Sequence, residues 1–317
     1  MIPEDWLDQA RARLNERVVL TPVSYDPELE VFFKWENRQT SGSFKLRGAL
    51  NKVLALQPWE RERGLVASSA GNHGQGVAIA GRETGSRVVV FTYQHASPLK
   101  IERMRVLGAE VRIDPGTYLD AEKAGQAFAA SQDMTWVSPY NDGQVIAGQA
   151  TIGLELIQQI VPFTPRTVLV PVGGGGLAAG IGLAMRRVKP PVKVIGVQSE
   201  ASSFFYALFH RGSRDGVVEL DSLADGLAGD LEEGSLTIPL ARRFLEDVRL
   251  VTEGQIAQAI AYAWHKYGER IEGAGAVGLA AVLSGAAPER PAVVIVSGGN
   301  IQPGLFDGII QGGSLVK

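Results

Sequence analysis

Short apolar runs alternate with helical patterns along almost the whole of this chain of 317 residues. The runs are rich in β-branched residues and apolar throughout, which is typical of parallel strands that are covered on both faces. We expect strands at residues 31–34, 65–67, 87–92, 110–113, 168–171, 193–198 and 292–297. The alternation predicts an α/β fold with parallel-rich, twisted sheets that helices cover on both faces.

Three loops rich in small residues each follow one of these strands directly. They read SSAGNHG at 68–74, GGGGL at 173–177 and SGGN at 297–300. In open α/β sheets, ligands bind outside the carboxyl ends of the strands. The three loops therefore predict one composite binding site.

Four consecutive glycines stand between an expected strand and an expected helix in VLVPVGGGGLAAGIGLAMRRV. Successive backbone N–H groups at the start of a helix form an anion cradle, and glycine lets a phosphate approach the backbone closely. Because four ordered glycines lose much conformational entropy, a purely structural turn is a poor explanation, and we predict a phosphate site. A dinucleotide is an alternative, since Gly173, Gly175 and Ala178 satisfy G-x-G-x-x-A and Glu200 follows the next strand.

The stretch TSGSFKLRGA at 40–49 sets Lys45 at the start of a helical pattern, next to Phe44. The positive end of a helix and partial burial both disfavour a protonated amine, so they predict a lowered pKa and a nucleophilic lysine. A solvated lysine in a first helical turn is the ordinary alternative. Ser297 could donate to a ring nitrogen, and loop 68–74 offers N–H groups to a carboxylate. An amine, a phosphate cradle, a hydroxyl and a carboxylate loop together indicate pyridoxal phosphate.

Six motifs in this order and spacing resemble the threonine/serine dehydratase and serine racemase family: SGSFKLRGA, SSAGNHGQGVA, VIAGQATIGLEL, VPVGGGGLAAG, LADGLA and SGGN. The resemblance covers nearly the whole chain. It implies a two-lobed enzyme of fold type II, the tryptophan synthase β-like fold, which binds pyridoxal 5'-phosphate and forms a homodimer. It also implies a large cofactor-binding domain of residues 1–52 and 145–317. Residues 53–144 would form a small mobile domain that carries the substrate-carboxylate loop.

The resemblance also assigns roles by position in this sequence. Lys45 would hold the cofactor as a Schiff base and carry the α-proton of the substrate. Phe44 would flank the cofactor ring, Asn72 would bind the ring 3'-oxygen, and Glu272 would lie near the cofactor edge. Ser297 would face the pyridine nitrogen. The phosphate would be bound by backbone N–H groups of Gly173, Gly174, Gly175, Gly176 and Leu177. The substrate carboxylate would be bound by Ser69, Ala70, Gly71, Asn72 and His73, without a proton-transfer role for the histidine.

The chain departs from this family at several positions. Ala70 stands where the racemases carry a serine that exchanges a proton on the opposite face of the substrate. An alanine methyl cannot carry a proton, which favours dehydration over racemisation. Gln198 and Phe204 stand where metal-binding relatives carry acidic ligands, so we expect no bound divalent metal. IEGAGAVG and Ala150 also depart from the common pattern, and they leave the choice of substrate open.

We therefore expect pyridoxal-phosphate-dependent elimination from L-threonine or L-serine, or from a related 3-hydroxy amino acid such as 3-hydroxyaspartate. The products would be a 2-oxoacid and ammonia. Two alternatives of the same fold are an amino-acid racemase and a β-replacement synthase. Two alternatives from other classes are an NAD-dependent dehydrogenase and a non-catalytic sensor of cofactor or amino acid.

Composition bears on partners and location. A net charge of -3 and a pI near 5.9 leave no basic footprint, so nucleic acid and anionic membranes are poor partners. The absence of cysteine excludes disulfides, thiol nucleophiles and thiolate metal sites. The segment MIPEDWLDQARARLNER lacks the apolar core of a signal peptide, and no apolar run approaches the length of a membrane span. These features predict a cytoplasmic protein.

Overall fold

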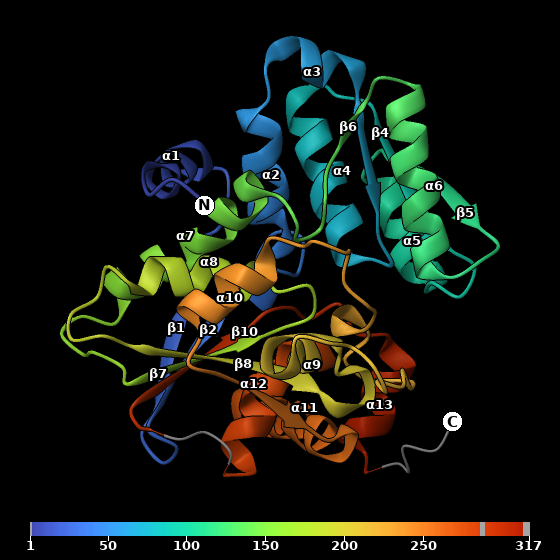
Figure 1. Cartoon of the computed structure of the whole chain (residues 1–317). Coiled ribbons are helices and arrows are strands. Elements are labelled where there is room, and N and C mark those ends of the chain that lie inside the picture. The colour runs from blue at the N-terminus through green and yellow to red at the C-terminus, as the bar shows by residue number, and fades with distance from the viewer. Residues whose placement is uncertain (1, 286–288, 313–317) are drawn as a thin grey trace.

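Two sheets organise the molecule in a computed structural model, which describes residues 2–285 and 289–312 (Figure 1). The larger sheet has the strand order β1-β2-β10-β7-β8-β9 and the smaller one the order β5-β4-β3-β6. The larger sheet contains β1 (Val23–Asp26), β2 (Val31–Trp35), β7 (Thr167–Pro171), β8 (Lys193–Ser199), β9 (Asp247–Val251) and β10 (Ala292–Val296). The smaller sheet contains β3 (Leu65–Ser68), β4 (Val88–Tyr93), β5 (Glu110–Asp114) and β6 (Thr135–Trp136). Only the pair β1–β2 is antiparallel among these strand pairs.

The larger sheet is covered on both faces because alternate residues of its strands point to opposite sides. In β10, Val294 and Val296 pack against α11 (Glu253–Tyr267), α12 (Gly273–Leu283) and α13 (Pro303–Ile310). The intervening Val293 and Ile295 face the other side of the sheet. That side is covered by α7 (Gly143–Gln159), α8 (Gly176–Met185), α9 (Phe204–Arg211) and α10 (Thr237–Phe244). We call this part of the molecule the large-sheet lobe.

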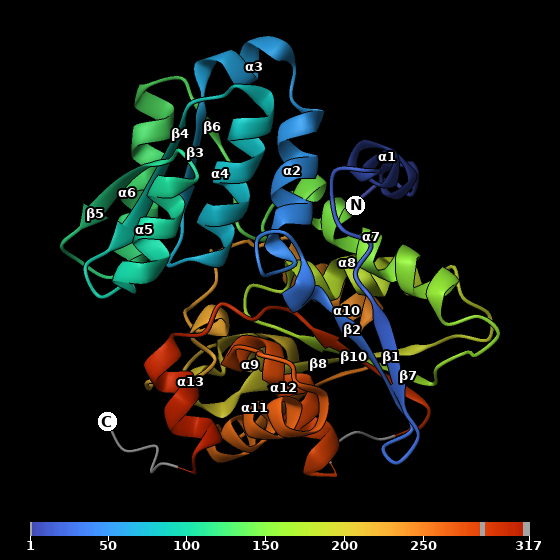
Figure 2. The same ribbon diagram turned by 180° about the vertical axis from the view of Figure 1, so that it is seen from behind.

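The smaller sheet follows the same rule. Val88 and Val90 of β4 pack with α2 (Lys45–Ala55), α4 (Asn72–Thr84) and α5 (Pro98–Val106), whereas Val89 and Phe91 face α6 (Tyr118–Ser131). We call β3–β6 with α3 (Pro58–Arg63), α4, α5 and α6 the small-sheet lobe (Figure 2). Helix α2 lies between this lobe and α7 (Figure 1). The remaining elements are α1 (Asp5–Leu14) and the 3-10 helices η1 (Glu36–Arg38), η2 (Glu200–Ser202) and η3 (Asp225–Leu227).

All seven expected strands are present, and the predicted α/β fold with parallel-rich, helix-covered sheets is confirmed. Strands β1, β6 and β9 were not expected. Two of them, β1 and β9, lie at the edges of the larger sheet and keep half-exposed, polar residues, as in VSYD and DVRLV. The third, β6, has only 2 residues and gives too short a pattern to recognise. In the described ranges no helix has the length and apolar character needed to cross a membrane.

Candidate functional site

The loops after β3, β7 and β10 hold most of the residues that the sequence singled out. Direct contacts join the first and last of these loops, because Asn300 Nδ2 donates to Asn72 Oδ1 at 2.7 Å. Asn72 Nδ2 donates in turn to Glu272 Oε1 at 2.6 Å, and the Glu272 N–H donates to the Gly298 carbonyl at 3.1 Å. The structure therefore brings Asn72 and Glu272 together, although 200 residues separate them in the sequence.

Lys45 is the first residue of α2, and its amine lies between the two lobes. Its Nζ donates to the Pro139 carbonyl at 2.9 Å and lies 5.3 Å from the centroid of the Phe44 ring. Burial lowers the pKa of Lys45 to about 8, although the carboxylate of Glu272 acts in the opposite direction. A substantial fraction of this amine is therefore neutral near physiological pH, as a nucleophile requires.

Ser297 is held next to the start of α2 by backbone contacts. The Phe44 N–H donates to the Ser297 carbonyl at 3.0 Å, and Ser43 pairs with Gly298 in an isolated antiparallel bridge. The Ser297 side chain is buried, and its Oγ donates to the Ala274 carbonyl at 3.3 Å. Backbone contacts thus join the end of β10, which is followed by Ser297, to the start of α2, which carries Lys45.

Glu272 is a buried carboxyl group with one satisfied oxygen. Its Oε1 accepts from Asn72, whereas no partner of its Oε2 is found among the described residues. Burial raises the pKa of Glu272 to about 7; Lys100 opposes this rise, and Asp225 adds to it. An unsatisfied buried oxygen is costly in a protein interior, so this atom is available to a bound ligand.

The loop expected to bind the substrate carboxylate is stabilised by its own hydrogen bonds. Ser69 Oγ accepts from the Gly71 N–H at 2.9 Å, and Ala70 between them is partly exposed. His73 Nε2 lies 2.8 Å from the Val137 carbonyl, to which it donates in the neutral tautomer that is protonated on Nε2. Burial, and then the charge of Lys45, lower the pKa of His73 to about 3. The histidine is therefore neutral and held by backbone, which agrees with the absence of a proton-transfer role.

The glycine loop is an anion cradle in its geometry. Helix α8 begins at Gly176 without any side-chain cap, and its N-cap Gly175 has a φ of 84°, in the left-handed region that favours glycine. A Cβ on Gly174 would lie 2.3 Å from the Tyr140 ring, so a side chain has no room there. Throughout the described part of the chain, nothing accepts a hydrogen bond from the backbone N–H groups of residues 173–177. Such free amides at a helix start fit the phosphate of pyridoxal phosphate.

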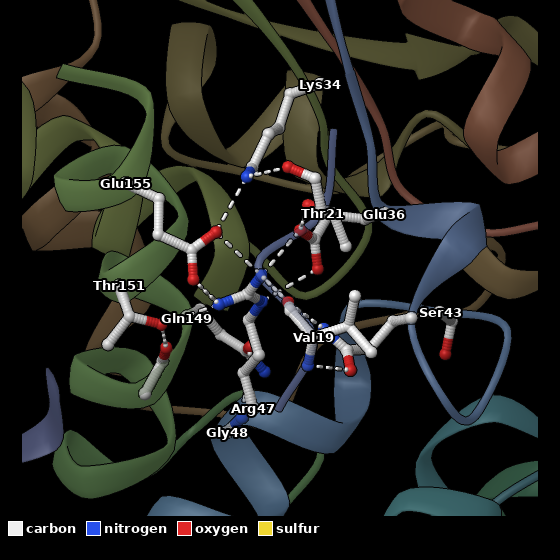
Figure 3. Close-up of polar contacts among 12 residues, drawn as sticks. Val19, Thr21, Lys34, Glu36, Ser43, Arg47, Gly48, Gln149, Thr151 and Glu155 are labelled. Carbon is white, nitrogen blue, oxygen red and sulfur yellow. Dashed lines mark hydrogen bonds and ion pairs between the residues drawn. The ribbon is translucent and has the colours of Figure 1, made fainter. Parts of the chain in front are cut away.

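A buried ionic network surrounds Arg47 in the first turn of α2 (Figure 3). Arg47 Nε and Nη2 both donate to the Glu36 carboxylate at 2.8 Å, while Arg47 Nη1 and Nη2 donate to Glu155 at 2.5 and 2.9 Å. Lys34 Nζ donates to Glu155 Oε2 at 2.6 Å and to the Thr21 carbonyl at 2.8 Å. Two cations thus face two carboxylates, and the network joins β2, η1, α2 and α7 two residues beyond Lys45.

The sequence reasoning missed two contributors to this region. Asn300 closes the link to Asn72 and also donates to the Ser41 carbonyl at 2.9 Å. Its place in SGGN was visible, but nothing in the sequence pointed to its partner. Arg47 was also overlooked, although an arginine in a predicted apolar helix face, two residues from Lys45, was a usable signal.

The positions considered for a metal and for a dinucleotide have the following surroundings. Gln198 Oε1 accepts from the Tyr206 N–H at 3.0 Å, and Phe204 is the first residue of α9. Across residues 2–285 and 289–312, no group of three or more His, Cys, Asp or Glu side chains could hold a metal ion. Glu200, the candidate ribose ligand of the dinucleotide alternative, is an exposed residue at the start of η2.

Comparison with known proteins gives consistent relatives. The profile of a family described as pyridoxal-phosphate dependent enzyme matches residues 16–298. An L-threonine ammonia-lyase of Thermotoga maritima is 39% identical over 100% of this chain and 80% of its own length. A putative threonine dehydratase of Sinorhizobium fredii is 37% identical over 96% of this chain and 94% of its own.

Two solved structures share the fold closely. A threonine deaminase of T.th. superposes with a TM-score of 0.85 at 33% identity, covering 94% of this chain and 98% of that one. Maize serine racemase superposes with a TM-score of 0.87 at 29% identity, covering 97% of each chain. Both a deaminase and a racemase are thus built on this architecture.

Proposed function

Because the chain belongs to the family of pyridoxal-phosphate dependent enzymes, we propose that it is an ammonia-lyase that acts on L-threonine. Its cofactor is pyridoxal 5'-phosphate, and its fold is the expected two-lobed fold type II. Because the chain belongs to this family, the NAD-dependent dehydrogenase is no longer a candidate. The relatives named threonine ammonia-lyase or dehydratase support the substrate, since they are 35–39% identical over most of this chain.

We assign the cofactor contacts to the residues that the site brings together. The free amides of residues 173–177 would bind the phosphate, and Ser297 Oγ would face the ring nitrogen. The neutral amine of Lys45 would join the cofactor aldehyde, with Asn72 and Phe44 beside the ring. The unsatisfied Glu272 Oε2 offers one further contact at the edge of the cofactor.

Bound pyridoxal phosphate supplies an electron sink for the pair of electrons released at the substrate Cα. Lys45 would take the α-proton on its own side of the substrate. The Ser69–His73 loop would hold the substrate carboxylate and fix its orientation. The Cα–H and Cβ–O bonds break, water leaves, and one water then returns by hydrolysis to give a 2-oxoacid and ammonia.

The observation that carries this proposal is a lysine whose pKa is lowered to about 8, next to a helix start whose row of backbone amides has no acceptor among the described residues. It is tested by purifying the protein with pyridoxal phosphate and L-threonine. We expect a yellow protein, a cofactor fixed to Lys45 by borohydride, and release of ammonia with a 2-oxoacid. A protein that gains no chromophore from the cofactor contradicts the proposal. A coloured protein that is inert towards amino acids would instead be the sensor.

A racemase is the second candidate, because maize serine racemase shares the fold. Ala70 weighs against it, since the face opposite Lys45 then lacks a side chain able to exchange a proton at that position. L-Serine, 3-hydroxyaspartate and a thiol co-substrate, assayed in parallel, separate a serine dehydratase, a hydroxyaspartate lyase and a β-replacement synthase. Accumulation of D-serine would identify the racemase.

We also propose the remaining features that the resemblance implied. These are a homodimer, a cytoplasmic location, and a large domain of residues 1–52 and 145–317 with a mobile small domain of residues 53–144. The continuous run of the small-sheet lobe between β3 and β6 supports the division. Light scattering that gave the mass of one 33.9 kDa chain would contradict the dimer.

A further inference from the structure

Lys100 is a buried lysine to which no role in the proposed reaction has been assigned. It lies on α5 in the small-sheet lobe, and it is only 7% exposed. Lysine is rarely buried to this extent unless its ammonium group is paired. Its Nζ donates to Asp225 Oδ2 at 2.7 Å, and Asp225 belongs to η3, which packs against α12 of the large-sheet lobe. The ion pair therefore joins the two lobes.

The alkyl part of Lys100 packs on the loop that we assign to the substrate carboxylate. A Cβ on Gly71 would lie 2.6 Å from Lys100 Cδ, so the absence of a side chain at Gly71 makes room for the lysine stem. The Gly71 N–H is already bound by Ser69 Oγ. The loop is thus fixed by Ser69 on one side and covered by Lys100 on the other.

The electrostatic surroundings keep Lys100 charged. Burial alone would lower the pKa of Lys100, but Asp225 and then Glu272 outweigh it, and the pKa is raised. The Asp225 side chain is 54% exposed, so the lysine of this ion pair is buried whereas its carboxylate is exposed to solvent. A second contact also joins α5 to the large-sheet lobe. Arg103 Nη1 of α5 donates to Asn300 Oδ1, in the loop after β10, at 3.0 Å.

From this arrangement we propose that Lys100 is a positioning residue for the substrate loop, which it holds in the binding conformation through its ion pair with Asp225. The inference rests on the proposed function, since it concerns the carboxylate site of the same reaction. The alkyl chain of Lys100 packs on Gly71, while its ammonium group is paired with Asp225 of the opposite lobe. Loss of the charge frees the stem, and the loop then spends less time in the orientation that binds a carboxylate.

The kinetic test uses Lys100→Met, which keeps an unbranched apolar side chain on Gly71 and removes the charge, and Asp225→Asn, which removes the partner. In both variants we expect the KM for L-threonine to rise by about tenfold, with kcat changed by less than about threefold, because uniform substrate binding is lost. The double variant should resemble either single variant, since the two side chains act as one unit. The absorbance and affinity of bound pyridoxal phosphate should not change.

The matched control is Lys193→Met, which breaks the exposed Lys193–Glu289 ion pair of 2.5 Å in the large-sheet lobe and should leave KM unchanged. The proposal is overturned if Lys100→Met and Asp225→Asn keep the wild-type KM. It is also overturned if kcat and cofactor affinity fall together with substrate binding, as general damage would cause. Should Lys100→Met fail to fold, Asp225→Asn decides alone, because Asp225 is the exposed partner.

Hydrogen exchange supplies a readout that does not depend on turnover. Backbone amides of residues 70–74 should exchange faster in Lys100→Met and Asp225→Asn than in the wild type or Lys193→Met, while those of α2 should not change. Unchanged exchange in the loop would refute the positioning role. A wild-type protein that binds cofactor but releases no ammonia from threonine would refute the proposed function only, and the exchange result would still stand.

Discussion

Lys45 and Glu272 influence each other's protonation within one buried site. Burial holds the pKa of Lys45 at about 8, and the Glu272 carboxylate keeps it from falling further. Burial likewise raises the pKa of Glu272 to about 7. The two groups therefore change charge over neighbouring pH ranges, and the state of one sets the reactivity of the other.

Amine labelling of the cofactor-free protein tests this coupling. A lysine with a lowered pKa loses its proton earlier as pH rises, so labelling of Lys45 should reach half its maximal rate near pH 8. Glu272→Gln removes the charge that raises this pKa, and the midpoint should move below that of the wild type. Mass spectrometry of the labelled peptides follows each site. Lys193 is the internal control, since Glu289 raises its pKa and its labelling belongs at higher pH. An unchanged Lys45 midpoint in Glu272→Gln would disprove the coupling, and equal profiles for Lys45 and Lys193 would disprove the lowered pKa of Lys45.

We propose that Ala70 limits proton exchange to one face of the substrate. A hydroxyl introduced by Ala70→Ser would stand on the loop that we assign to the carboxylate, opposite the lysine. A positioned acid–base group contributes about 10²–10⁴-fold in rate, so we expect racemisation of L-serine to rise by at least about tenfold. Chiral chromatography of D-serine measures it, and Ala70→Gly is the control without a hydroxyl. If both variants form D-serine at the same rate, the missing hydroxyl is not what limits racemisation.

At the scale of elements, the start of α2 is stabilised by ion pairs rather than by a side-chain N-cap. Its N-cap residue makes no side-chain hydrogen bond, and Arg47 instead anchors the first turn to Glu36 and Glu155 (Figure 3). The side chains of Arg47 and Glu36 are fully buried, and Lys34 balances the second carboxylate. The network thus gives the lysine-bearing helix a fixed direction without leaving a net buried charge.

Removing one member of this network should be costly, because the remaining charges stay buried. We expect Arg47→Met to lower the free energy of unfolding by about 3–5 kcal/mol. Arg47→Lys should recover only part of this loss, since lysine cannot form the paired contacts of a guanidinium group. Urea denaturation measures both variants. Arg187→Met breaks the exposed pair with Asp8 and should cost no more than about 1 kcal/mol, and an equal loss in Arg47→Met would show the network to be unimportant.

At the scale of the whole molecule, local patterns predicted the elements better than the contacts between them. The buried strands were recognisable because apolar, β-branched runs such as VVIV are typical of strands that are covered on both faces, whereas the half-polar edge strands β1 and β9 looked like loops. Lys45, Ser297 and the glycine loop stood out because their residue types are unusual for their positions.

The pairings that complete the site were invisible for a physical reason. Lys100 and Asp225 are 125 residues apart, and Asn72 and Asn300 are 228 apart. Each is an ordinary polar residue in its own segment, and only the tertiary fold gives it a partner. Glu36 and Glu155 likewise lie far apart in the sequence, and only the fold brings both carboxylates to Arg47.

The position of β10 governs when such a chain can finish folding as it leaves the ribosome. This last strand is inserted between β2 and β7, so the larger sheet has a gap at its centre until residue 296 has emerged. The small-sheet lobe, whose strands run continuously from residue 65 to 136, can assemble earlier. Since Ser297 follows β10 directly and its carbonyl accepts from the Phe44 N–H, a nascent chain cannot join the start of α2 to Ser297 until β10 has been synthesised.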